Sequence, residues 1–120
     1  PICKEERRFI NTTFEMVSVI RETGCDNIKL IVDLFLFALE EEDPSLLQKF
    51  ASDGILAHIH AAAMPFRTIP TIGDTQQMRA VLRPLITAGF NGRISIEAFP
   101  TDAEDSIQQG VKVIRSALAG

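Results

Sequence analysis

The chain has 120 residues, of which 46% are hydrophobic and 23% charged, and its net charge of −4 gives a pI near 5.1. These values fit one small globular domain or a part of a larger one, and they argue against a disordered segment. An acidic chain without an uninterrupted cluster of Lys and Arg is not expected to bind nucleic acid or an anionic membrane surface.

The cysteines and the apolar runs indicate a cytoplasmic protein. Cys3 and Cys25 match no familiar disulfide or zinc spacing, which favours reduced thiols. No apolar run approaches the roughly 20 residues of a membrane-spanning helix, and no signal peptide opens the chain. We therefore expect a cytoplasmic location and no membrane contact.

Four segments carry helix signals. Each begins with a side chain that can cap a helix N-terminus, followed by a capping-box partner or by proline, and the first three stop at a glycine. The segments are 12–24, 43–54, 74–89 and the one that begins at 101. Between them the three residues Glu40, Glu41 and Glu42 are interpreted as a solvated acidic turn.

Three short runs rich in β-branched residues lie between these helices, at 28–33, 55–60 and 93–99. Strands that alternate with helices predict βα units and a parallel sheet, within one domain that spans 1–120. No glycine-rich phosphate loop follows any of the three strands, so the pattern gives no support to a dinucleotide-binding fold.

Each predicted strand carries, at its end or two residues before it, a residue that can bind a metal ion: Asp33, His60 or Glu97. Parallel strands of a barrel present their carboxyl ends at one common face, where active sites lie. Side chains alternate along each strand, so His58 and Leu56 are predicted to share the face of His60. The two carboxylates and the imidazole are therefore candidates to converge.

Four stretches together resemble one known family. They are "ERRFINTTFE" (6–15), "LIVDLFLFALEEED" (30–43), "LAHIHAAAMPFRTIPTIGD" (56–74) and "GFNGRISIEAF" (89–99). In this order and spacing they resemble the C-terminal half of the xylose isomerase-like TIM barrels, the sugar (phosphate) isomerase and epimerase group. The resemblance implies an α/β fold, a partial (βα) TIM barrel made of the last three strands and their helices.

The resemblance also implies a site and a reaction. The family holds one divalent ion, most often Mn, Mg or Co with Zn as an alternative, through Glu, Asp, His and Glu. Carried over, Asp33, His60 and Glu97 are metal ligands, and Glu97 is also a catalytic acid or base. Arg67 and His58 would contact a sugar or sugar-phosphate substrate. The implied chemistry is proton abstraction next to a carbonyl, with the metal stabilising the enediolate.

Two departures from the family pattern leave a second function open. The first metal-binding glutamate would stand immediately before "PICK", so the sequence holds three of the four ligands, and position 36 is Leu where the family often has His. The alternative function is a catalytically inactive half-barrel that acts as a self-associating or interaction module. A sugar or inositol dehydratase also remains open, whereas an abasic-site endonuclease would need a three-metal cluster that two histidines and an acidic chain disfavour.

Each candidate residue also has a purely structural interpretation. Asp33 could cap the chain by accepting from a following amide, and Glu97 could pair with a neighbouring arginine. His58 could be a hydrogen-bonded histidine of the barrel interior, and Arg67 a solvated loop residue. An unpaired carboxylate at Asp33, inside an apolar run, would be costly to bury without a cation or a donor.

Three strands cannot close a barrel, which needs eight. The face that would point into the barrel, predicted to carry Ile31, Leu56 and His58, would then meet water, and both sheet edges would be open. Exposed apolar surface costs about 25 cal/mol per Å². We therefore expect a homo-oligomer, or association with an N-terminal half of the barrel.

Overall fold

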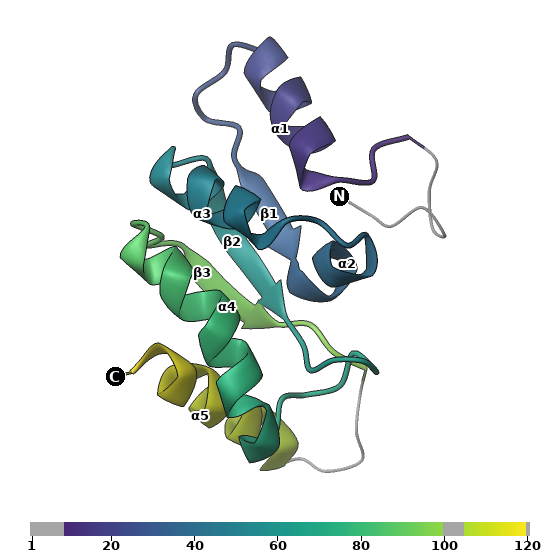
Figure 1. The fold of residues 1–120 in the computed structure, drawn as a ribbon, viewed down its shortest axis with the longest axis vertical. Helices are drawn as coiled ribbons and strands as arrows, with labels where there is room; N and C mark the ends of the chain where they lie inside the picture. Colours follow the sequence, from purple (N-terminus) through teal and green to yellow (C-terminus); the bar gives the residue numbers. More distant parts are fainter. Residues whose placement is uncertain (1–8, 100–104, 120) are drawn as a thin grey trace.

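Three parallel strands form an open sheet in the order β1, β2, β3 (Figure 1). The computed structural model describes residues 9–99 and 105–119. The elements in chain order are α1 (Thr13–Glu22), β1 (Leu30–Asp33), α2 (Leu34–Leu39), α3 (Pro44–Ser52), β2 (Leu56–Ala61), the 3₁₀ helix η1 (Ile72–Asp74), α4 (Thr75–Thr87), β3 (Arg93–Ile96) and α5 (Asp105–Leu118). The predicted α/β fold, a partial TIM barrel, is confirmed.

The predicted helix stops are also confirmed. Gly24, Gly54 and Gly89 follow α1, α3 and α4 with φ values of 63°, 69° and 100°. This left-handed backbone region is open to glycine without steric cost, so each glycine turns the chain out of its helix. None of the helices in the described ranges is both long enough and apolar enough to cross a membrane.

All three predicted helix starts that fall in the described residues are at the correct position, but the predicted side-chain cap is present at only two of them. Thr12 and Glu15 form the capping box of α1. The Asp43 carboxylate accepts from Ser45 N at 2.9 Å at the start of α3, and this hydrogen bond holds the pKa of Asp43 below its usual value. Asp74 does not cap α4 with its side chain. Its carboxylate accepts instead from the amide and hydroxyl of Thr71, three residues earlier. These two hydrogen bonds form the capping box of η1. The predicted start at 101 lies outside the described residues.

One helix was not predicted. α2 begins directly after β1, with Asp33 as both the last strand residue and the N-cap. Asp33 accepts from the amides of Phe35 and Leu36 at 2.9 and 3.2 Å. No turn residue separates strand from helix, and an apolar run of this length carries no periodicity that distinguishes the two.

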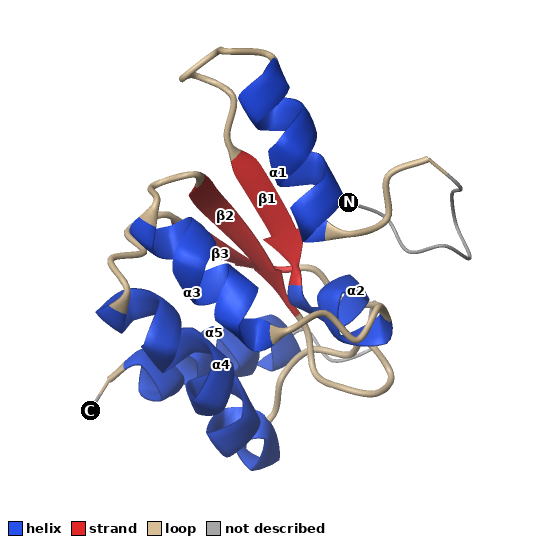
Figure 2. Ribbon diagram, turned by 45° about the horizontal axis from the view of Figure 1, so that its top comes forward, coloured by secondary structure: helices blue, strands red, loops and turns tan. Residues whose placement is uncertain are grey.

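The core lies between the sheet and the helices that pack on its outer face (Figure 2). Leu30, Val32 and Ile59 point to this side and are at most 2% exposed. On the opposite face, which would point into a closed barrel, Ile31 is 42% exposed. The expected exposure of the inner face therefore holds for Ile31.

The expected exposure of the inner face does not hold for Leu56, which is 4% exposed. The pairing register of β1 with β2 shifts by one residue here: Leu30 pairs with Leu56, but the next residue, Ile31, pairs with His58. Ala57 is the extra residue on β2, so Leu56 falls on the buried outer side with Leu30. The prediction that Leu56 shares the inner face with His58 is therefore wrong.

Glu42 is not part of a solvated turn either. Its carboxylate accepts from the Thr13 amide at 3.0 and 2.9 Å and from the Thr13 hydroxyl. Thr13 is fully buried, and its amide, in the first turn of α1, has no acceptor within the helix, so Glu42 supplies one. Glu42 thus joins the end of the α2–α3 connection to α1.

Gly92, directly before β3, passes close to Ala57, the extra residue of β2, so we expect that only glycine is tolerated at position 92. A Cβ at Gly92 would lie 2.0 Å from the Ala57 carbonyl oxygen. We expect Gly92→Ala to lower the free energy of unfolding by at least about 2 kcal/mol, measured in urea. Gly73→Ala is the matched control, because a Cβ there meets only Thr71 Oγ1 at 3.7 Å. Equal stability of the two variants would contradict this account of the register shift.

Candidate metal centre

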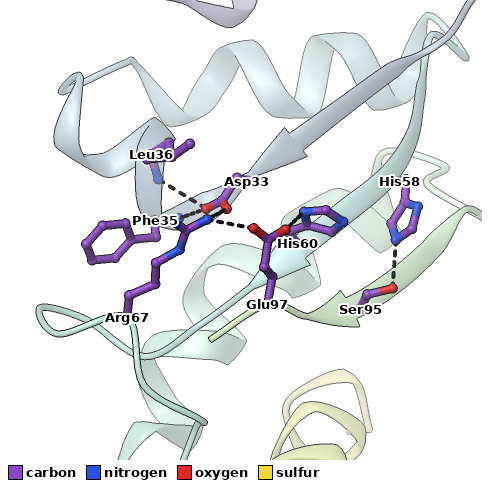
Figure 3. Close-up of polar contacts among 8 residues, drawn as sticks. All are labelled: Asp33, Phe35, Leu36, His58, His60, Arg67, Ser95 and Glu97. Atoms are coloured by element: carbon purple, nitrogen blue, oxygen red, sulfur yellow. Dashed lines mark hydrogen bonds and ion pairs between the residues drawn. The ribbon is translucent and has the colours of Figure 1, made fainter. Parts of the chain in front are cut away.

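Asp33, His60 and Glu97 meet at the carboxyl edge of the sheet (Figure 3). Asp33 pairs with His60 across β1 and β2, and the Glu97 amide, just past β3, donates to the Ala61 carbonyl at 3.1 Å. One ligand atom of each of the three side chains lies within 4.8 Å of the others. The convergence expected from the strand ends is thus present in the fold.

Asp33 uses its two oxygens for different partners. Oδ1 accepts from the two α2 amides, and Oδ2 accepts from Arg67 at 2.6 Å. The Asp33 side chain is 9% exposed. The capping interpretation is therefore correct for Oδ1, while Oδ2 faces the cluster.

Arg67 lies between the two carboxylates. One guanidinium nitrogen donates to Asp33 Oδ2 and, at 2.9 Å, to Glu97 Oε1. The side chain is 16% exposed, and its guanidinium carbon is 5.6 Å from the centre of the Phe35 ring. Arg67 is therefore not a solvated loop residue, and Glu97 does pair with an arginine.

The two histidines occupy successive levels of the same face. His60 Nδ1 pairs with Glu97 Oε2. His58 lies edge-on to His60 with 5.0 Å between ring centres, and its Nε2 is hydrogen-bonded to Ser95 Oγ at 2.8 Å. Ser95 was not singled out in the sequence, although its position two residues before Glu97 places it on the same face.

The donor set fits a divalent ion. Two carboxylates and one imidazole suit Mn, Mg, Co or Zn better than a metal that selects thiolates. Two donors on opposite sides of an ion at about 2.1 Å would be about 4.2 Å apart. The 4.8 Å limit within the cluster is close to this separation, so small side-chain movements would bring the three ligand atoms into range.

Comparisons with known proteins identify the family and the fold. The family model described as xylose isomerase-like TIM barrel matches residues 1–117. A structure of L-ribulose 3-epimerase superposes with a TM-score of 0.65 at 19% identity, covering 90% of this chain and 43% of the epimerase. A fusion of a xylose isomerase-like TIM barrel with 4-hydroxyphenylpyruvate dioxygenase gives 0.62 at 24% identity, covering 92% and 20%. No curated protein sequence matches the chain.

The chain belongs to the family of xylose isomerase-like TIM barrels. It spans less than half the length of the epimerase and about a fifth of the fusion protein. At these identities the two structures establish the fold.

The two roles of Asp33 predict different costs for two substitutions. Asp33→Asn retains a side-chain oxygen that can cap α2 but replaces Oδ2, the acceptor for Arg67, by an amide nitrogen, whereas Asp33→Ala removes both the cap and the acceptor. We expect Asp33→Ala to be less stable than Asp33→Asn by about 1 kcal/mol in urea unfolding, the usual value of an N-cap. If the two variants unfold at the same denaturant concentration, the cap contributes nothing to stability.

Proposed function

We propose that the chain carries part of the active site of a sugar or sugar-phosphate isomerase or epimerase that abstracts a proton next to a carbonyl. The observation that carries this proposal is the meeting of Asp33, His60 and Glu97 within 4.8 Å at the carboxyl edge of a parallel sheet. Family membership and the fold of an L-ribulose 3-epimerase support it.

Asp33, His60 and Glu97 would hold the divalent ion. When bound, the ion supplies Lewis acidity next to the substrate oxygens. Asp33 is suited to a fixed ligand, because two amides of α2 orient its carboxylate. His60 would bind through Nδ1, the ring nitrogen that faces Glu97.

Glu97 is the candidate acid or base. Its side chain is 48% exposed, so its carboxylate can be reached by a substrate that approaches the open edge of the sheet. A carboxylate placed beside the carbon next to a carbonyl can accept its proton and return it. We assign Arg67 and His58 as substrate contacts, Arg67 through its guanidinium and His58 one level deeper on the same face.

The competing function is a half-barrel without activity, which keeps the fold as an interaction module. The apolar side chain at position 36, where the family often has His, favours this alternative. Proton exchange separates the two functions, because an interaction module has no reason to exchange a substrate proton with water.

We expect the full-length protein, loaded with Mn²⁺ or Mg²⁺, to exchange the proton next to the carbonyl of at least one ketose or ketose phosphate in D₂O. Loss of the corresponding proton signal in NMR spectra measures the exchange. Glu97→Gln should slow it by about 100-fold or more, because a general base is removed. Glu22→Gln, the same change on the exposed end of α1, should leave it unchanged. If none of the ketoses and ketose phosphates tested exchanges this proton, the result would favour the inactive half-barrel.

We also propose that the open surfaces of the sheet are covered by further barrel elements, from the same polypeptide or from a second copy of the chain. Ile31 is exposed on the inner face. Beside β3 a groove of about 560 Å³ runs between the sheet and α5, with apolar side chains along it. These include Ile94, Ile96, Ile107 and Val111.

Sedimentation of the 120-residue chain at micromolar concentration tests this assembly. We expect concentration-dependent association of the isolated chain, because apolar area withdrawn from water stabilises by about 25 cal/mol per Å². Replacing Ile31 by Thr should weaken association through the inner face. A well-folded monomer that binds no hydrophobic dye would contradict the proposal.

A further inference from the structure

We propose that Arg67 competes with the divalent ion for the site, so that binding of the ion and departure of the guanidinium are one event. This inference rests on the proposed metal site and adds a regulation of that site. Within the described part of the chain, Arg67 is placed where both carboxylates of the cluster can be neutralised by one cation (Figure 3).

The first argument is that the guanidinium and the ion need the same oxygen of Asp33. Oδ1 of Asp33 already accepts from two α2 amides, which leaves Oδ2 as the oxygen that faces the cluster. Oδ2 is the atom that Arg67 holds at 2.6 Å, and the same nitrogen holds Glu97 Oε1 at 2.9 Å. A guanidinium and a divalent ion on these two oxygens would lie only a few Å apart, where like charges repel strongly.

The second argument is the backbone of Arg67. Its φ of 53° lies in the left-handed region, which is uncommon for a residue with a side chain. The surrounding backbone is hydrogen-bonded: the Arg67 carbonyl accepts from Phe99 N, and the next carbonyl, of Thr68, accepts from Ala63 N, both at 2.8 Å. The loop backbone therefore presents Arg67 to the carboxylates at a conformational cost, and a departure of the guanidinium would take place through its side chain.

The third argument is charge balance. Asp33 is nearly buried, and burying a carboxylate is costly unless a cation or hydrogen-bond donors lie beside it. Arg67 supplies that cation when no ion is bound, so the two carboxylates can lie close together. An incoming ion provides the compensation in its place and makes the guanidinium redundant there.

Calorimetric titration with Mn²⁺ at neutral pH tests the competition. We expect Arg67→Met to bind Mn²⁺ at least about tenfold more tightly than the unmodified chain, since the ion no longer displaces a cation. Arg21→Met is the matched control: it removes the same charge from an exposed pair with Asp53 and should change the affinity by less than about twofold. Equal or weaker binding by Arg67→Met would overturn the inference.

A second measurement needs no substitution at Arg67. Titration with diamagnetic Mg²⁺, followed through the arginine side-chain NMR signals, should shift the Arg67 Nε–H signal toward those of exposed arginines in step with binding. An Arg67 signal that stays unchanged while the ion binds would show that the two cations coexist, and would overturn the competition.

The variant His60→Gln separates this inference from the proposed function. Ion binding that is lost in His60→Gln but is no tighter in Arg67→Met leaves the metal site standing and overturns only the competition. Ion binding that is the same in His60→Gln as in the unmodified chain places the ion elsewhere, and overturns both. Loss in His60→Gln together with tighter binding by Arg67→Met supports both.

Discussion

Two carboxylates brought to the end of a parallel sheet repel each other unless a cation lies between them, and the described residues meet this condition with Arg67. Its guanidinium bonds to Asp33 at the end of β1 and to Glu97 directly after β3. Asp33 in turn begins α2. One ion-pair network therefore connects β1, the loop after β2 and the chain that follows β3, and it determines how the cluster is held.

Much of this arrangement could be predicted because it depends on local signals and on a general rule. Capping residues and glycines locate helix ends through the chemistry of one turn. The carboxyl ends of parallel strands meet at one edge, so a polar residue at each strand end is enough to predict that Asp33, His60 and Glu97 come together. The family resemblance added the roles proposed for these residues, which the positions alone do not supply.

The features that escaped prediction depend on contacts between distant residues. Leu56 changes face because Ala57 adds a residue to β2, and Gly92, far along the chain, permits the close approach there. Glu42 is hydrogen-bonded to Thr13 through the packing of α1, which no local pattern encodes. Arg67 lies in a long connection and has a left-handed backbone conformation that is unusual for arginine. The direction of its side chain therefore could not be derived from its spacing in the sequence.

The origin of the three candidate ligands on three separate strands has a consequence for folding. In the unfolded chain they are tens of residues apart, so an ion that needs all three has little affinity for that state. Such an ion would act as a reversible cross-link of tertiary structure, and at 100 times its dissociation constant it would stabilise the native state by about 2.7 kcal/mol. The supply of divalent ions would then govern how long the protein survives proteolysis.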